Sequence, residues 1–154
     1  MSEKRTEINQ ALKKAMIEKD QVTLSTVRLL MAALKDRDIN ARGAGKGDQL
    51  SDEEILSLIQ SMIKQRHESS KVYRDGGRED LAELEEQEIK VLEGFLPAQM
   101  GEDEILHAVE GIMLELGVND IKDMGKVMTE LKTRYAGQMD MGRASGIVKQ
   151  RLAA

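Results

Sequence analysis

Apolar residues recur every three or four positions along most of this chain, a spacing typical of amphipathic α-helices. A first helix is predicted over about residues 3–19, and the side chain of Asp20 can cap a second helix. Residues 43–48 are rich in glycine and predict a flexible loop. The positions expected to face inward are Ile8, Ala11, Leu12, Ala15, Leu24, Val27, Met31 and Leu34. We expect these two helices to form a hairpin.

Two further helices are predicted after the loop. Ser51 and Glu54 have the spacing of a capping box, in which each side chain bonds the other residue's backbone N–H, before a long third helix. That helix should end near Gly76, and a fourth is predicted over about residues 78–93. The four segments predict an N-terminal antiparallel helical bundle.

The helical pattern breaks in the middle of the chain. Residues 94–101 contain the only proline, Pro97, and the helix-stopping glycines Gly94 and Gly101. We therefore predict an N-terminal domain over residues 1–94, a linker over 95–101 and a small C-terminal domain over 102–154. Three helices are expected in the C-terminal domain, the second of them over about residues 120–134.

Composition supports an all-α fold, because the chain has ten methionines but only one phenylalanine, two tyrosines and no tryptophan. It has no cysteine, which excludes disulfides, thiolate catalysis and sulfur-ligated metal sites. No segment approaches the roughly 18 apolar residues of a membrane span, and the start lacks the apolar core of a signal peptide. We expect a cytoplasmic protein with no membrane partner.

Charge is distributed unevenly along the chain. The formal net charge of −5 argues against indiscriminate nucleic-acid binding, and we expect no DNA partner. Residues 121–154 nevertheless carry seven basic residues and three acidic ones. They are Lys122, Lys126, Lys132, Arg134, Arg143, Lys149 and Arg151 against Asp123, Glu130 and Asp140. A contact with a polyanion is therefore expected in this part of the chain.

Within that segment, Gly125 lies between Lys122 and Lys126 inside a helical pattern. The expected buried face comprises Ile121, Met124, Gly125, Met128 and Leu131. A glycine inside a helix costs about 1 kcal/mol relative to alanine, which suggests that something approaches the backbone closely. Either a second helix packs over Gly125, or the two lysines, four residues apart, meet phosphates beside it.

A second group of basic residues lies on the predicted third helix. It comprises Lys64, Arg66, Lys71 and Arg74. No aromatic residues are interleaved to stack on bases, so the group is at most a strip that faces phosphates. The alternative is that these residues form ion pairs between helices.

Recognisable catalytic chemistry is missing from the sequence. We find no glutaminase nucleophile with its base, no cradle for ATP phosphates and no metal cluster, and we expect no cofactor and no metal. The two histidines, His67 and His107, lack the spacing of zinc ligands. We expect the protein not to be catalytic alone.

Several segments, in order along the chain, resemble the GatB/YqeY family, whose members are similar to the C-terminal tail of the GatB subunit of tRNA-dependent amidotransferases. They are residues 24–30, 32–35, 63–66, 77–81, 95–97, 122–128 and 147–149. The resemblance implies an N-terminal helical bundle followed by a small three-helix domain. It also implies a role near tRNA, because the tail of the amidotransferase senses the tRNA elbow.

By this resemblance, Lys122, Gly125 and Lys126 are the expected RNA-facing residues, with Arg143 and Lys149 as further candidates. Near Asp140 the positive charge is one place later than in the family pattern, at Arg143. The expected partner is tRNA or a tRNA-handling enzyme. Two alternatives are a component of a carbon–nitrogen ligase complex with glutamine as amido donor and a helical protein–protein adaptor with no RNA role. The oligomeric state is left open.

Overall fold

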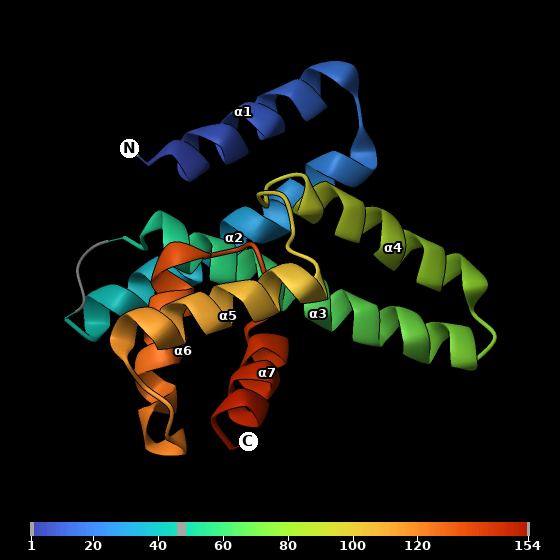
Figure 1. Ribbon diagram of the computed structural model, residues 1–154. Coiled ribbons are helices and arrows are strands. Elements are labelled where there is room, and N and C mark those ends of the chain that lie inside the picture. Colours follow the sequence, from blue (N-terminus) through green and yellow to red (C-terminus); the bar gives the residue numbers. More distant parts are fainter. Residues whose placement is uncertain (1, 46–48, 154) are drawn as a thin grey trace. The chain divides into compact units, whose positions relative to one another are not determined.

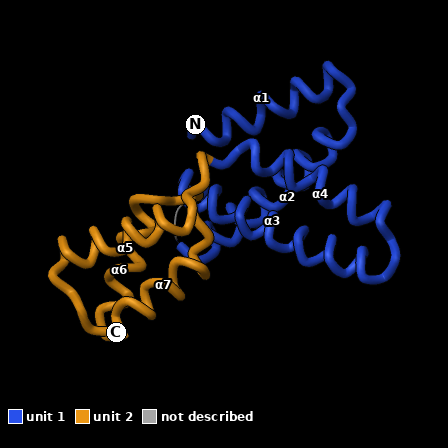
Figure 2. The backbone as a smooth tube through the Cα atoms, turned by 45° about the vertical axis from the view of Figure 1, so that its right-hand side comes forward, with its two compact units in different colours: residues 1–96 blue, residues 97–154 orange. Residues whose placement is uncertain are grey.

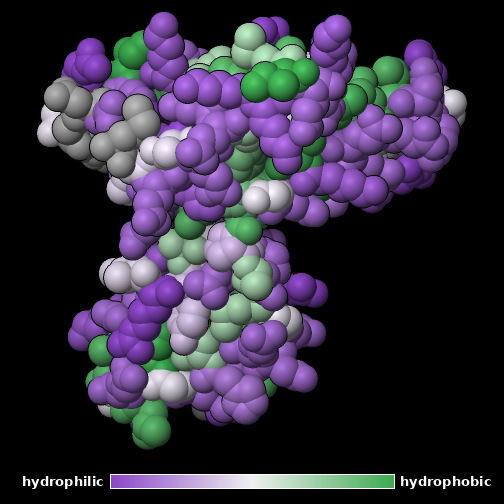
Figure 3. All heavy atoms as spheres, turned by 90° about the horizontal axis from the view of Figure 1, so that it is seen from above, coloured by the Kyte–Doolittle hydropathy of each residue, from purple (hydrophilic) through white to green (hydrophobic). Residues whose placement is uncertain are grey.

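The computed structural model describes residues 2–45 and 49–153, and every regular element in these residues is helical (Figure 1). The all-α prediction is confirmed. The chain divides into two compact units, residues 1–96 and residues 97–154 (Figure 2). Within the described residues, no helix is both long and apolar enough to cross a membrane. Hydrophilic residues dominate the face shown in Figure 3, with apolar residues in smaller groups among them.

Four helices form the first unit. They are α1 (Glu3–Glu18), α2 (Gln21–Gly43), α3 (Asp52–Asp75) and α4 (Glu79–Glu93). The most extensive pairing is between α3 and α4, which are joined by the short turn at Gly76 and Gly77. Of the predicted loop over residues 43–48, Gly43 ends α2, and residues 46–48 lie outside the described residues.

The start of each of the first three helices follows from local capping chemistry. The hydroxyl of Ser2 accepts the Arg5 N–H at the start of α1, and the Asp20 carboxylate accepts the Thr23 N–H at the start of α2. The predicted capping box is present at α3, where Ser51 and Glu54 bond each other's backbone N–H. These contacts satisfy N–H groups that have no partner inside the helix.

The core of the first unit is largely aliphatic. It is made by Ile8, Val27, Leu30, Leu34, Leu50, Ile55, Leu58, Ile59, Met62, Leu92 and Phe95. The predicted linker over residues 95–101 therefore begins with a core residue, because Phe95 is buried and Leu96 packs against the same cluster. At the other end of that linker, the Met100 N–H donates to the Gln138 carbonyl within the second unit.

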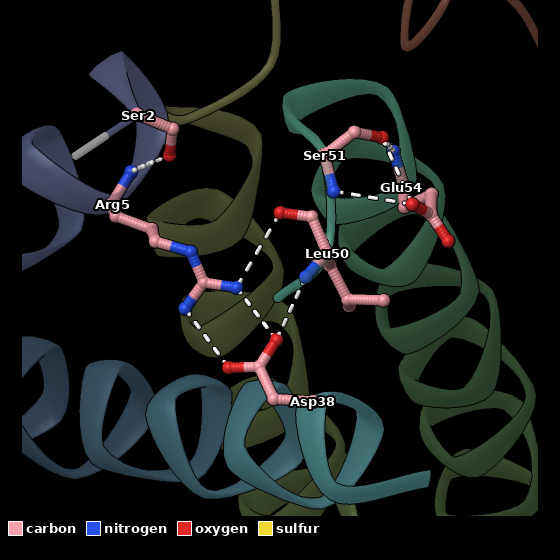
Figure 4. Close-up of polar contacts among 6 residues, drawn as sticks. All are labelled: Ser2, Arg5, Asp38, Leu50, Ser51 and Glu54. Atoms are coloured by element: carbon pink, nitrogen blue, oxygen red, sulfur yellow. Dashed lines mark hydrogen bonds and ion pairs between the residues drawn. The ribbon is translucent and has the colours of Figure 1, made fainter. Parts of the chain in front are cut away.

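Two nearly buried ion pairs connect the helices of the first unit. Arg5 of α1 donates from both terminal nitrogens to the Asp38 carboxylate of α2, at 3.0 and 2.7 Å (Figure 4). Asp38 also accepts the Leu50 N–H at 2.9 Å, just before α3. Between α3 and α4, Arg66 Nε donates to Glu88 at 3.0 Å. Because each carboxylate has a directed partner on another segment, these contacts fix how the helices are aligned.

The second unit contains α5 (Glu102–Leu116), a 3-10 helix η1 (Ile121–Asp123), α6 (Met124–Arg134) and α7 (Met141–Ala153). Its core is separate from that of the first unit. It is made by Ile105, Val109, Ile112, Val127, Leu131, Met139, Ala144, Val148 and Leu152. All the expected RNA-facing residues belong to this unit.

Candidate nucleic-acid interface

The segment around Gly125 is not one continuous α-helix. The side chain of Asp120 accepts the Lys122 N–H at 3.1 Å and begins a single 3-10 turn, and α6 starts only at Met124. Lys122 therefore lies in η1, whereas Gly125 and Lys126 lie in the first turn of α6. A glycine in the first turn costs less than one in the interior of a helix, because N–H groups there have no partner inside the helix in any case.

Of the two alternatives for Gly125, the packing of a second helix over it is contradicted by the structure. Gly125 is exposed, and apart from its chain neighbours and its own helix backbone, no atom of the described residues lies within 4 Å of the position that a Cβ would occupy. The face of α6 that is fully buried contains Val127 and Leu131 instead, while Ile121 is 44% exposed. The 3-10 turn changes the helical phase before Met124, so the spacing from Ile121 onward does not describe one face.

The side chains of both lysines beside Gly125 are in solvent. Lys126 is 72% exposed, and its ammonium lies 3.8 Å from the Asp123 carboxylate, at the outer limit of an ion pair. Lys122 is exposed and makes no ion pair with any residue that the structure describes. Open backbone with two solvated ammonium groups beside it is suited to contacting phosphate oxygens.

The two candidates on α7 do not form one strip. Arg143 and Lys149 are both exposed, but six residues at 3.6 residues per turn place them about 120° apart around the helix axis. Near Arg143, the Asp140 carboxylate accepts the Gly142 N–H at 2.9 Å at the start of α7. A single phosphate backbone running along α7 would therefore meet Arg143 or Lys149, but not both.

Two other basic residues of the segment are already paired. Arg134 donates to Glu115 at 2.6 Å and to Glu130 at 3.0 Å, and Arg151 contacts Glu110 at 3.1 Å. The hydrogen bond from Arg134 lowers the pKa of Glu115. The positive charge left for a ligand is therefore concentrated in Lys122, Lys126, Lys132, Arg143 and Lys149.

Two threonines that the sequence analysis did not select as site residues lie on the same side of α6 as Gly125. Thr129 and Thr133 are exposed and follow Gly125 at intervals of four residues. The hydroxyl of Thr129 donates to the Gly125 carbonyl at 2.8 Å, and that of Thr133 donates to the Thr129 carbonyl at 3.0 Å. The repeated spacing of four was the signal available in the sequence. Because these polar side chains are short, the backbone at Gly125 stays accessible from this side of the helix.

On α3, the structure shows the ion-pairing alternative for both arginines of the second basic group. Arg66 and Glu88 pair with side chains only 13% and 15% exposed, and Arg74 contacts Glu79 at 2.9 Å and Glu86 at 2.8 Å. The hydrogen bonds from Arg74 to these two carboxylates raise its pKa. Lys64 and Lys71 are exposed, so phosphate contact by this group would rest on the two lysines.

In residues 2–45 and 49–153, no group of three or more His, Asp or Glu side chains is placed to hold a metal ion. Both histidines, His67 and His107, are exposed.

Comparison with known proteins identifies the family. A family model described as Yqey-like protein matches residues 5–152. The chain belongs to the Yqey-like protein family. The match covers both units of this Yqey-like protein, so the family relation does not depend on the C-terminal segment alone.

The relatives of this Yqey-like protein include several proteins named "Altered inheritance of mitochondria protein 41, mitochondrial". The one from Pyrenophora tritici-repentis is 36% identical over 129 residues, which are 80% of this chain and 68% of the relative. The one from Clavispora lusitaniae is 25% identical over 141 residues, 90% of this chain and 78% of the relative. The one from Lachancea thermotolerans is 35% identical over 85 residues, 55% of this chain and 43% of the relative. Their names place these relatives in mitochondria, and the cytoplasmic location expected for this chain stays a prediction.

Proposed function

We propose that this Yqey-like protein is a non-catalytic accessory protein that binds folded tRNA through the surface around the start of α6. We call this surface the α6 face and define it as Lys122, Gly125, Lys126 and Thr129. The observation that carries the proposal is the open backbone at Gly125 between two exposed lysines. The resemblance to the amidotransferase tail supports tRNA as the polyanion.

The charge of the protein favours a localised contact over general adhesion to nucleic acid. The whole chain is acidic, with a formal charge of −5, so a polyanion is repelled except where basic side chains gather. The exposed lysines of the α6 face provide such a place, and the absence of a side chain at Gly125 lets a phosphate approach the helix backbone. The helix N-terminus adds a favourable partial positive charge.

The test is the binding of folded tRNA to the full-length protein, measured by fluorescence anisotropy over a series of salt concentrations. Three or four phosphate contacts, made by the two lysines of the α6 face and one or two of the other exposed basic residues of the second unit, predict a slope of log K against log salt of roughly −2 to −4. Replacing Lys122 and Lys126 together with alanine should flatten the slope by about 1.5, because two phosphate contacts are lost. The matched control is Lys64→Ala with Lys71→Ala, which removes two exposed lysines of α3 and should leave the slope unchanged.

A second variant tests the backbone approach itself. In Gly125→Leu the new side chain points into open space in the folded unit, so its circular dichroism should match that of the wild type. The leucine would cover the backbone and weaken binding by about tenfold or more, equivalent to about 1.4 kcal/mol. If the double lysine variant binds tRNA with the affinity and salt dependence of the wild type, the α6 face is not the RNA site. If only the α3 control variant loses tRNA binding, the RNA site is on α3.

A further inference from the structure

The C-terminal end of α5 carries an exposed apolar residue beside a groove. Leu114 is 85% exposed, the highest value for a large apolar side chain in the part of the chain that the structure describes. It lines a surface groove of about 470 Å³ together with Met113 and Val118. Glu110 and Arg151 line the same groove, so it is bordered by the ends of α5 and α7.

Local sequence explains why the groove forms there. Gly117 adopts the left-handed conformation with φ 66°, its N–H donates to the Leu114 carbonyl, and the Val118 N–H donates to the Met113 carbonyl. This is a Schellman motif, which ends a helix and commonly brings the residue after the glycine against the last turn. Val118 and Met113 accordingly both pack against the core of the second unit and form the apolar floor of the groove. Leu114, one position further around the helix, is left in solvent.

We propose that this patch is a dimer interface between two copies of this chain. A two-fold symmetric interface uses the same surface on both copies, so the surface must be complementary to itself. This patch is, because Leu114 is a protruding apolar side chain and the groove beside it has an apolar floor formed by Met113 and Val118. Each copy can insert its Leu114 into the groove of the other.

The charges at the groove are also self-complementary. Glu110 and Arg151 lie 3.1 Å apart and are 39% and 49% exposed, so one acidic and one basic group are presented together. When a copy is rotated onto its partner, Arg151 of one copy can face Glu110 of the other. A basic or acidic protein surface would meet one unlike and one like charge here, whereas a second copy meets two unlike charges. An interface centred on one small groove is expected to be weak and transient, so association should be sought at micromolar concentrations and above.

The first experiment is analytical ultracentrifugation of the full-length protein up to high micromolar concentration. The wild type should show a monomer–dimer equilibrium, and Leu114→Asp should be monomeric throughout. The matched control is Ile17→Asp, on α1, because Ile17 is 81% exposed and the substitution places the same charge on another surface. Both side chains are in solvent, so both variants should keep the circular dichroism of the wild type. The proposal is overturned if the wild type remains monomeric, or if Leu114→Asp associates as the wild type does.

A charge exchange tests which residues meet. In Arg151→Glu and in Glu110→Arg, each taken alone, the homodimer would bring like charges together twice, so both variants should be monomeric. When the two variants are mixed, a heterodimer would pair unlike charges at both contacts, and dimerisation should return. If the mixture stays monomeric while the wild type dimerises, the two-fold pairing of Arg151 with Glu110 is refuted. This test does not depend on RNA binding.

Discussion

Exposed ion pairs occur in both units, but among the described residues the nearly buried pairs belong to the first unit. In the first unit, the pairs Arg5–Asp38 and Arg66–Glu88 are nearly buried, with every side chain 13% or 15% exposed. In the described part of the second unit, each ion pair has a partner that is at least 39% exposed, as in Arg134–Glu115 and Arg151–Glu110. The first unit uses these charges for internal alignment, whereas the second keeps its charge in solvent.

This difference determines what each set of charges can do. A nearly buried pair is costly to separate, since one removed partner leaves the other charge without compensation, so it holds helices in place. An exposed pair contributes about 0–1 kcal/mol and can exchange its partner for a phosphate or for another protein at little cost. Both surfaces that we propose as contacts, the α6 face and the groove at Leu114, accordingly lie on the second unit.

The largest expected effect comes from removing Asp38. Asp38→Ala leaves the guanidinium of Arg5 and the Leu50 N–H without their acceptor, and should cost about 2–4 kcal/mol. Urea unfolding of the full-length protein measures the loss, and hydrogen exchange should locate it in peptides of the first unit. The control is Glu115→Ala in the second unit, whose pair with Arg134 is exposed, so its loss of stability should be much smaller. Equal losses in the two variants would abolish the contrast between the units.

Helix ends in the left-handed conformation differ in the residue that adopts it. Gly77 follows α3 with φ 79° and Gly117 ends α5 with φ 66°, whereas α1 of the first unit ends at a non-glycine residue, Lys19, with φ 57°. A side chain is strained in this conformation, so Lys19→Gly should stabilise the protein by about 0.5–1 kcal/mol. Gly117→Ala should destabilise it by about 1 kcal/mol. Opposite shifts of the urea midpoint would support this, and shifts of the same sign would contradict it.

The contribution of Glu85 to the stability of the first unit should depend on pH, because the fold does not stabilise the charged form of this carboxylate. Burial and the neighbouring charge of Glu88 raise the pKa of Glu85 above its ordinary value of 4.5, although Arg66 opposes the shift. The folded state therefore favours protonated Glu85, and the stability gained from protonation is lost as pH rises through the raised pKa. Glu85→Gln should stabilise the protein modestly at neutral pH, and the gain should disappear below the ordinary pKa. Thermal unfolding of both proteins from acidic to neutral pH measures this difference.

Asp38 provides the opposite sign within the same unit. Burial alone would raise the pKa of Asp38, but hydrogen bonds from Arg5 and the Leu50 N–H, with the charge of Arg5, lower it below its ordinary value of 3.8. Its contribution to stability is therefore present at neutral pH and lost as pH falls through the lowered pKa. For the Glu85→Gln variant, in contrast, a gain in stability that persisted at all pH values would show that the ionised carboxylate of Glu85 is not its cause.

The features predicted well from the sequence are those that depend on neighbouring residues. Helix starts such as Asp20 and the Ser51–Glu54 box are set within four residues, and the structure has them where the sequence placed them. The burial of Phe95 was not predictable from its neighbours, because it depends on contacts with residues distant in the sequence. The 3-10 turn before Met124 likewise escaped a search for a period of 3.6, and the resulting error in helical phase placed Gly125 on the expected buried face, although it is exposed. The exposure of Lys122 and Lys126 did follow from the sequence, since charged residues beside an apolar stripe face solvent.

The smallest expected effect concerns the N-terminus of α5, which has only half of the capping box that begins α3. Glu104 accepts the Gly101 N–H at 3.2 Å, but Gly101 has no side chain to accept the Glu104 N–H in return. A Cβ at position 101 would lie 3.7 Å from the nearest atom, the Glu104 Oε1, so Gly101→Ser fits without displacement. The serine hydroxyl should complete the box and add a few tenths of a kcal/mol, seen as slower amide exchange in the first turn of α5. The matched control is Ser51→Gly, which should remove a similar amount from α3. If Gly101→Ser speeds exchange in α5 while Ser51→Gly speeds it in α3, then the two caps are not equivalent, and the start of α5 is held by something other than its cap.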